Sequence, residues 1–147
     1  MINEINDKIT LVYYDLDGNI AMESVWASNE GTGYRIKNIP FFAPNLAYDD
    51  LISVEDDNGE LFFDDILEES GNTTIQLIIY NEKDIESITK KIESFECGWE
   101  GSHLKGYISV NVPKEICYKP VKNFLNNEFV DKKLDYKEAC LSHEKLD

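Results

Sequence analysis

The first half of the chain alternates hydrophobic and polar positions over short stretches, the period-two pattern typical of β-strands. Two pairs of these stretches are separated by Asp17-Gly18 and by Asn58-Gly59, and such dipeptides supply the positive backbone φ that a tight hairpin requires. Strands are expected at residues 12–14, 20–27, 34–36, 51–54 and 61–67. The pattern therefore predicts a small antiparallel sheet, curled or closed into a partial barrel, over residues 1–72.

The hydrophobic period changes in the second half of the chain. Residues 75–80 are almost continuously apolar, which indicates a central strand buried on both faces. Hairpin strands are expected at residues 98–103 and 107–112. Two stripes at helical spacing predict amphipathic helices on either side of this hairpin. The stripes are Ile85, Ile88, Ile92 and Phe95, with Asn81 or Asp84 as the N-cap, and Val121, Phe124, Leu125 and Phe129, with Pro120 in the first turn.

The order of these elements predicts an α+β fold. Residues 73–129 are expected to form a β-α-β-β-α unit, the split β-α-β or ferredoxin-like arrangement, in which two helices cover one face of an antiparallel sheet. Its usual fourth strand is expected to be missing or very short, and residues 134–141 to add one short helical turn. The chain would then hold an antiparallel β subdomain (residues 1–72) and a β-α-β-β-α subdomain (residues 73–147), packed as one compact unit.

A loop with two prolines joins the third and fourth expected strands. In the stretch Asn38-Ile-Pro-Phe-Phe-Ala-Pro44 the prolines fix φ and remove backbone donors, which excludes a helix interior or a central strand. We expect the two adjacent phenylalanines to close the rim of the N-terminal core. Trp26, Phe41, Phe42 and Phe62 are predicted to fill that core.

Negative charge is concentrated in the first half of the chain. The protein has a formal net charge of −15, and residues 1–80 hold 16 acidic residues against only Lys8, Arg35 and Lys37. Ten acidic residues and no basic one lie between Asp49 and Glu69. Such a surface repels nucleic acids and anionic membranes, whose binding proteins are basic, and it speeds encounter with basic proteins.

Several features favour a soluble protein of the reducing cytoplasm. No apolar run approaches the roughly 20 residues that span a bilayer. The N-terminal stretch MINEINDKIT has neither the basic start nor the apolar centre of a signal peptide. Cys97, Cys117 and Cys140 are odd in number and widely spaced, which predicts free thiols rather than a disulfide framework.

Several segments resemble the bacterial domain-of-unknown-function family 4265. They are Val25-Trp-Ala27, Tyr34-Arg-Ile-Lys-Asn-Ile-Pro-Phe-Phe-Ala43, Asp49-Asp-Leu-Ile52, Ser70-Gly-Asn-Thr-Thr74, Val112-Pro113 and Asp135-Tyr-Lys-Glu-Ala139. The resemblance spans most of the chain, and its Asn-Ile-Pro-Phe-Phe-Ala stretch is fairly specific. It implies no activity, because the family carries none that is established.

Each catalytic motif in the sequence lacks a required part. Asp15-Leu-Asp-Gly18 superficially resembles the nucleophile motif of haloacid-dehalogenase-type phosphatases, but no α/β fold follows it, so a hairpin turn is the better interpretation. An EF-hand loop fails as well, because its twelfth position is Trp26 rather than Glu. The adjacent pairs Asp64-Asp65 and Glu68-Glu69 would point to opposite faces of a strand, which disfavours a glycosidase pair.

The cysteine and histidine residues do not match the pattern of a metal site or of a catalytic nucleophile either. Cys140 and His143 have short spacing, but a structural zinc needs four ligands and only distant residues remain. Cys97 or Cys117 beside His103 would make a nucleophile pair, yet nothing local activates a thiolate. We therefore expect no catalytic residues, no cofactor and no metal site.

The remaining hypothesis is a non-enzymatic module that binds a basic protein, most specifically an immunity protein that neutralises a nuclease-type bacterial toxin domain. That idea is an analogy of size and acidity. A regulatory or scaffold protein, a nucleic-acid mimic and an unrecognised enzyme are the alternatives. Trp99, between glycines, is either an exposed anchor for the partner or a side chain packed over the sheet edge. The candidate binding residues are Asp49, Asp50, Glu55, Asp56, Asp57, Glu60, Asp64, Asp65, Glu68, Glu69 and Trp99.

Overall fold

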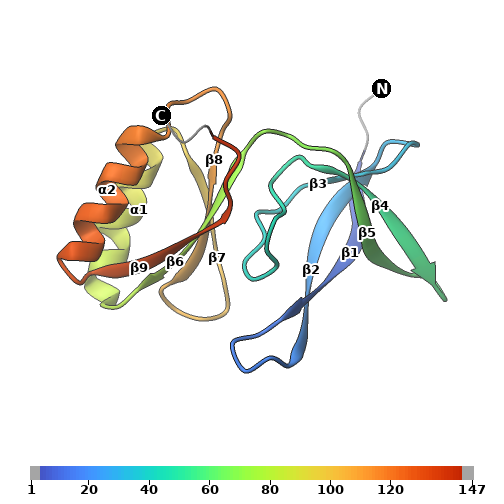
Figure 1. Ribbon diagram of the computed structural model, residues 1–147, viewed down its shortest axis with the longest axis horizontal. Coiled ribbons are helices and arrows are strands. Elements are labelled where there is room, and N and C mark those ends of the chain that lie inside the picture. The colour runs from blue at the N-terminus through green and yellow to red at the C-terminus, as the bar shows by residue number, and fades with distance from the viewer. Residues whose placement is uncertain (1–3, 144–147) are drawn as a thin grey trace.

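The computed structural model describes residues 4–143 and contains three layers: a closed five-stranded barrel, a four-stranded antiparallel sheet and a pair of helices (Figure 1). The strands are β1 (Ile5–Tyr14), β2 (Ile20–Asn29), β3 (Tyr34–Ile36), β4 (Leu51–Asp57), β5 (Glu60–Glu68), β6 (Thr73–Ile79), β7 (Gly98–Gly101), β8 (Tyr107–Val112) and β9 (Leu134–Cys140). The helices are α1 (Ile85–Ser94), preceded by the 3₁₀ turn η1 (Glu82–Asp84), and α2 (Lys119–Val130). The fold is thus of the α+β class.

The barrel is a meander that closes on itself. Each strand from β1 to β5 pairs antiparallel with the next. Because five strands alternate in direction, the closing pair β1–β5 must be parallel, and it pairs Ile9 with Leu61 and Thr10 with Phe62. Its buried interior is aliphatic and is formed by Ile9, Leu11, Val25, Ala27, Ile36, Ala43, Leu46 and Ile52.

The prediction that four aromatic residues fill the barrel core was wrong. Trp26 is 44% exposed, because its neighbours Val25 and Ala27 face the interior and strand alternation turns the indole outward. The Lys8 ammonium lies 4.9 Å from the centre of its ring. Phe62 is only partly buried, since Leu61 and Phe63 on either side of it pack against the core. Phe41 and Phe42 are also partly buried.

The sheet has the strand order β7-β8-β6-β9, and all neighbouring strands are antiparallel. Both helices lie on the same face of it, opposite the barrel (Figure 1). On β6, Ile75, Leu77 and Ile79 pack in the core shared with the helices, whereas Thr74, Gln76 and Ile78 take the alternate positions toward the barrel.

Strand β9 corrects the expectation of a helical turn and of a missing strand at the C-terminus. Residues 134–140 pair with β6 over almost its whole length. Their burial alternates, with Leu134 and Tyr136 packed on the helix side and Asp135 and Lys137 exposed. A seven-residue segment with this pattern gains more from backbone hydrogen bonds to an open strand than from two helical turns.

The helices follow the predicted stripes with one exception. Asn81 caps the turn before α1, where its side-chain oxygen accepts a hydrogen bond from Lys83 N–H, and Pro120 lies in the first turn of α2. The stripe of α2 ends early, because Phe129 is half exposed. No helix within residues 4–143 has the length and apolar composition to cross a membrane.

The loop of residues 37–50 lies between the barrel and the sheet and joins them by hydrogen bonds (Figure 1). Three side chains on the barrel-facing side of the sheet donate to its carbonyl groups: Ser109 Oγ to Ile39, Tyr107 Oη to Phe41 and Thr74 Oγ1 to Leu46, at 2.9 Å each. The contact between the layers therefore includes several hydrogen bonds to loop carbonyls, whereas the core between sheet and helices is apolar.

Candidate partner-binding surfaces and interlayer cleft

The acidic hairpin, defined here as β4, β5 and the turn between them, carries most of the predicted binding residues on its surface. Asp56 Oδ1 accepts a hydrogen bond from Gly59 N–H and closes the turn, while Asp57 and Glu60 face each other across the two strands. Seven of the predicted carboxylates are exposed and form no salt bridge with any described residue: Glu55, Asp56, Asp57, Glu60, Asp64, Asp65 and Glu69.

The other three predicted carboxylates are either buried or paired with a cation. Asp50 is only 2% exposed, and it accepts hydrogen bonds from the backbone N–H groups of Ala47 and Ser70, so its inclusion as a binding residue was wrong. Asp49 forms an ion pair of 2.6 Å with Lys37, and Glu68 lies 3.5 Å from Arg35. These cations are remote in sequence, which is why the local charge count missed them.

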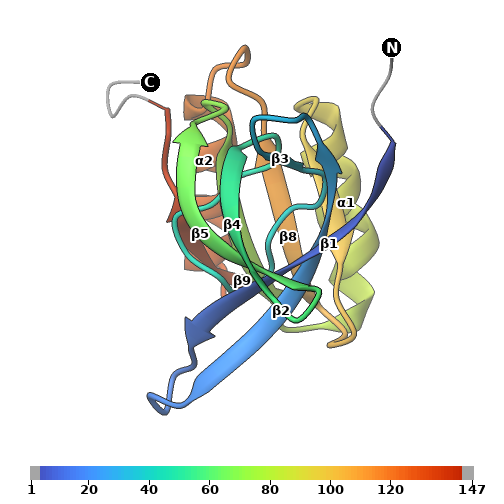
Figure 2. The same ribbon diagram turned by 90° about the vertical axis from the view of Figure 1, so that its right-hand side faces the viewer.

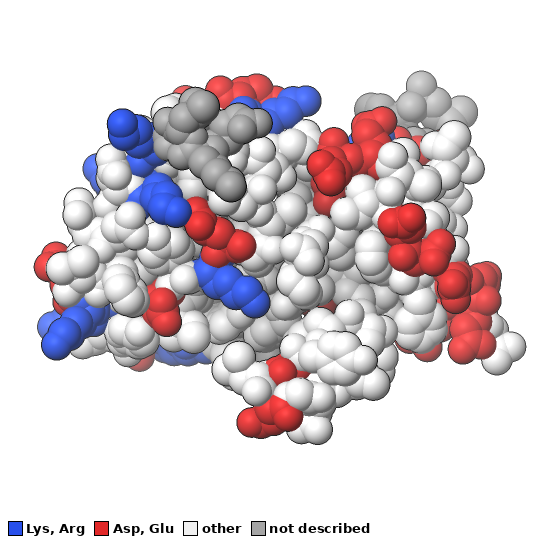
Figure 3. Space-filling model, viewed as in Figure 1, with Lys and Arg blue, Asp and Glu red and all other residues white. Residues whose placement is uncertain are grey.

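Charge is segregated between the layers of the molecule. In Figure 3 the basic side chains gather over the helices and the neighbouring strands, while the barrel side carries mostly acidic ones. Residues 1–72 hold 16 acidic and three basic residues, a net charge of −13, which is most of the total. The barrel is therefore the negatively charged end of the molecule, and its electrostatic field attracts a basic molecule.

A second surface, which the sequence analysis missed, is the outer face of the β1–β2 hairpin. Figure 2 shows this hairpin extending beyond the rest of the barrel. Val12 lies opposite Met22 and Tyr14 opposite Ile20, and all four side chains are at least half exposed. The presence of apolar residues at both odd and even positions of these strands could have indicated this surface. Side chains alternate between the two faces of a hairpin, so when only one face packs against the core the apolar side chains of the other face stay exposed.

Trp99 lies on the edge strand β7 and is partly buried against the sheet–helix core. Its Nε1 donates a hydrogen bond of 2.8 Å to Glu93 of α1. Of the two interpretations made from the sequence, packing over the sheet edge describes this side chain better than a fully exposed anchor.

A cleft of about 510 Å³ separates the β1–β2 hairpin from the barrel-facing side of the sheet. The ring of Phe42 stacks between Tyr13 of β1 and Tyr107 of β8, with centroid distances of 5.6 Å and 4.9 Å. Burial and the nearby carboxylates of Glu23 and Asp15 raise the pKa of Tyr13. The cleft is lined by Tyr13, Tyr14, Asp15, Leu16, Asp17, Phe42, Gln76, Ile78, Tyr107, Asp135, Tyr136 and Lys137.

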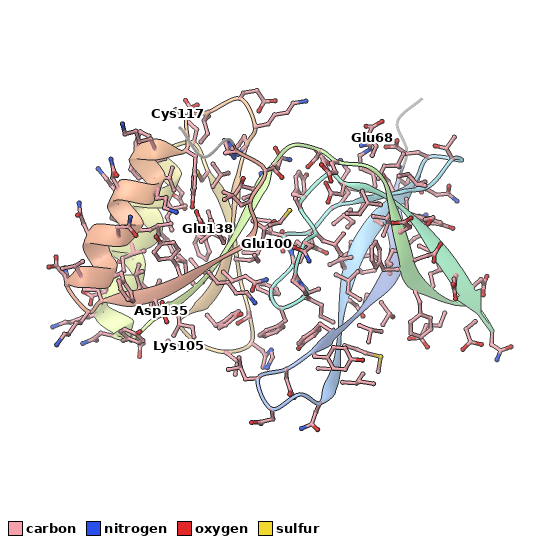
Figure 4. The ribbon with its side chains drawn as sticks, in the orientation of Figure 1. Glu68, Glu100, Lys105, Cys117, Asp135 and Glu138 are labelled. Carbon is pink, nitrogen blue, oxygen red and sulfur yellow. The ribbon has the colours of Figure 1, made fainter. Side chains whose placement is uncertain are left out.

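Glu100 occupies the seam between the sheet and the loop (Figure 4). Its carboxylate accepts hydrogen bonds of 3.0 Å from the Asn38 side chain and from Ile39 N–H. Burial raises the pKa of Glu100, although these two hydrogen bonds partly oppose the shift. The residue ties the layers together, and the like charge of the nearby Glu23 carboxylate also raises its pKa.

The thiols and histidines do not converge on a site. Burial raises the pKa of Cys97 to about 12, whereas Cys117 is exposed. His143 Nδ1 lies 2.6 Å from Thr73 Oγ1 and its Nε2 lies near two backbone carbonyls, so the neutral ring with its proton on Nε2 satisfies all three contacts. Among residues 4–143, no three His, Cys, Asp or Glu side chains are grouped to hold a metal.

Comparison with known proteins places the chain in a family without assigning it an activity. No curated protein matches it. One solved structure, described as a novel crystal structure of a hypothetical protein from Neisseria gonorrhoeae, is 33% identical and has a TM-score of 0.83, with 97% of this chain and 100% of that chain covered. The family model described as "Domain of unknown function (DUF4265)" matches residues 23–135. The protein therefore belongs to the DUF4265 family, as the segments around the Asn-Ile-Pro-Phe-Phe-Ala stretch indicated.

Proposed function

We propose that this protein is a non-enzymatic acidic module that binds a basic protein in the cytoplasm, most specifically an immunity protein that neutralises a basic bacterial toxin domain. The observation that carries the proposal is the set of six exposed carboxylates on the acidic hairpin, none of which forms a salt bridge with a described residue. The acidic hairpin would cover the cationic surface with which a nuclease-type toxin binds nucleic acid. Electrostatic attraction of this kind accelerates association and selects partners of opposite charge.

The apolar face of the β1–β2 hairpin supports the same proposal. It belongs to the same barrel as the acidic hairpin, because β1 pairs directly with β5. Protein interfaces typically combine a desolvated apolar centre with a polar or charged rim. Val12, Tyr14, Ile20 and Met22 supply such a centre, and the carboxylates of the barrel supply the rim.

The test is association with the protein encoded by the gene adjacent to this one, measured by stopped-flow fluorescence at 50 and 200 mM salt. Replacing Asp56, Asp57, Asp64 and Asp65 together by Asn should slow association at least about tenfold at low salt and flatten its salt dependence. The fold should persist, because Asn keeps the side-chain oxygen with which Asp56 closes the turn.

A control variant removes the same number of charges from the opposite side of the molecule. Glu82, Glu86 and Glu96 are changed to Gln and Asp131 to Asn, all exposed residues of the helical layer and its loops. Association of this control should stay within about twofold of the parent. If both variants associate equally slowly, the effect comes from the net charge of the protein and not from the acidic hairpin. If the barrel variant associates as fast as the parent, the acidic hairpin is excluded as the binding surface.

We also propose that residues 73–140 form a split β-α-β unit of the ferredoxin-like type. Supporting this, α1 connects β6 to β7 with β8 inserted between them, and α2 connects β8 to β9 at the other side of β6. An experimental structure with β8 outside the β6–β7 pair would contradict the assignment.

A further inference from the structure

The cleft between the β1–β2 hairpin and the sheet has a lining that suits a planar cation. Its wall includes three stacked rings from different parts of the chain, Tyr13, Phe42 and Tyr107, with interplanar angles of 14° and 28° between neighbours. One of these rings is fixed further by the loop, since Tyr107 Oη donates a hydrogen bond to Phe41 C=O. Aromatic faces carry negative electrostatic potential and attract cations that lie against them.

Gln76 provides an unused polar group in the same cleft. The residue is 5% exposed, lies on the barrel-facing side of β6 and lines the cleft. Its Nε2 donates a long hydrogen bond of 3.4 Å to Pro40 C=O, while its Oε1 has no hydrogen-bond partner among the described residues. This oxygen is therefore free to accept a hydrogen bond from a ligand donor in the cleft.

The charged residues at the mouth of the cleft favour a cation. Three lining residues are acidic, Asp15, Asp17 and Asp135, and one is basic, Lys137. Asp15 Oδ1 accepts hydrogen bonds from Asp17 and Asn19 N–H in the hairpin turn, so the turn holds this carboxylate in place. Lys137 pairs in register with Gln76 on the adjacent strand, which places it beside the buried amide.

We propose that this cleft binds a guanidinium group, the arginine side chain of a basic protein partner. The inference rests on the proposed function and identifies one anchor of that interface. Guanidinium is planar, stacks on aromatic rings and is weakly hydrated, and its several N–H donors match the Gln76 carbonyl and the carboxylates at the mouth. An ammonium group is a compact, strongly hydrated charge and uses the flat wall less well.

The probe is N-acetyl-arginine amide, titrated into the isotopically labelled full chain and followed by NMR. The Gln76 side-chain NH₂ and the ring signals of Tyr13 and Tyr107 should shift together, with a Kd on the order of 1 mM for a ligand of this size. N-acetyl-citrulline amide has the same shape without the charge and should bind at least about fivefold more weakly. Equal binding of the two, or no shift of these signals, would overturn the proposal.

Three variants test the residues of the cleft. Lys137→Met should tighten arginine binding and Asp135→Asn should weaken it, each roughly two- to fivefold, because both side chains are exposed at the mouth. Tyr13→Leu keeps an apolar side chain but removes an outer ring of the stack, and should weaken binding further. Glu55→Gln, on the acidic hairpin, does not line the cleft and should leave binding unchanged. Weaker binding of the arginine probe by Lys137→Met would contradict a cation site in the cleft.

The outcome separates this inference from the proposed function. If the arginine probe binds and the neighbouring gene's product does not, the cleft is a guanidinium site and the toxin-immunity role fails. If that product binds the parent, Tyr13→Leu and Lys137→Met with equal affinity, the function stands and the cleft is not its anchor site.

Discussion

The Glu23 carboxylate of β2 accepts a hydrogen bond of 2.7 Å from the backbone N–H of Ala43, in the loop between barrel and sheet. It accepts two more from Phe41 and Phe42, at 3.0 Å and 2.9 Å. One side chain thus satisfies three consecutive backbone donors in a segment whose prolines prevent regular secondary structure. The loop presents its carbonyl groups to the sheet on its other side, so Glu23 orders the contact between the layers.

Replacing Glu23 by Ala should lower the free energy of unfolding by about 2–4 kcal/mol, because three partly buried N–H groups lose a charged acceptor. Urea unfolding followed by circular dichroism measures the change. Glu55→Ala, an exposed barrel residue, is the control and should shift the free energy by less than about 0.5 kcal/mol. Similar values for both variants would contradict a structural role for Glu23.

Glu100 should make stability fall as pH rises through its titration. Its folded-state pKa lies above the ordinary value of 4.5, so between the two values the folded chain binds more protons than the unfolded chain. The free energy of unfolding therefore decreases with pH across that window. In Glu100→Gln this contribution is absent, and the stability advantage of the parent over the variant should shrink from pH 4 upward. A difference that is constant or grows with pH would contradict the raised pKa.

The three thiols should react with dithionitrobenzoate at very different rates at pH 8. Cys117 is exposed and should react first, whereas Cys97 is buried with a pKa of about 12, so only about one molecule in 10⁴ carries its thiolate. Burial also raises the pKa of Cys140. Cys117→Ser should abolish the fast phase, and unfolding in urea should expose all three thiols. Rapid labelling of Cys97 in the folded protein, located by peptide mass spectrometry, would contradict this packing.

The facing carboxylates of Asp57 and Glu60 should cost stability, because like charges directly opposite in a hairpin repel. Asp57→Lys should raise the free energy of unfolding by about 0.2–1 kcal/mol in low salt. In a Glu60→Gln background the gain should be smaller, and 1 M NaCl should largely remove it. A gain independent of salt and of Glu60 would have to come from something other than charge.

Local patterns predicted most of the secondary structure of this protein. The Asp-Gly and Asn-Gly turns, the apolar run of β6 and the helical stripes at Ile88, Ile92, Val121 and Leu125 all lie where they were expected. Each depends on a property of a few neighbouring residues, such as backbone φ at glycine or the spacing of apolar side chains. Such properties are present in the sequence before any tertiary contact forms.

Only the tertiary structure decided the rest, because the deciding partners are distant in sequence. The barrel closes through Thr10 and Phe62, residues 134–140 become a strand because β6 offers an unpaired edge, and Asp50 is buried by contacts to Ala47 and Ser70. The cleft likewise exists because Tyr13, Phe42 and Tyr107 converge from three segments. A local sequence pattern cannot predict these long-range contacts. They depend on the overall packing, which settles on the arrangement that leaves the fewest apolar and hydrogen-bonding groups unsatisfied.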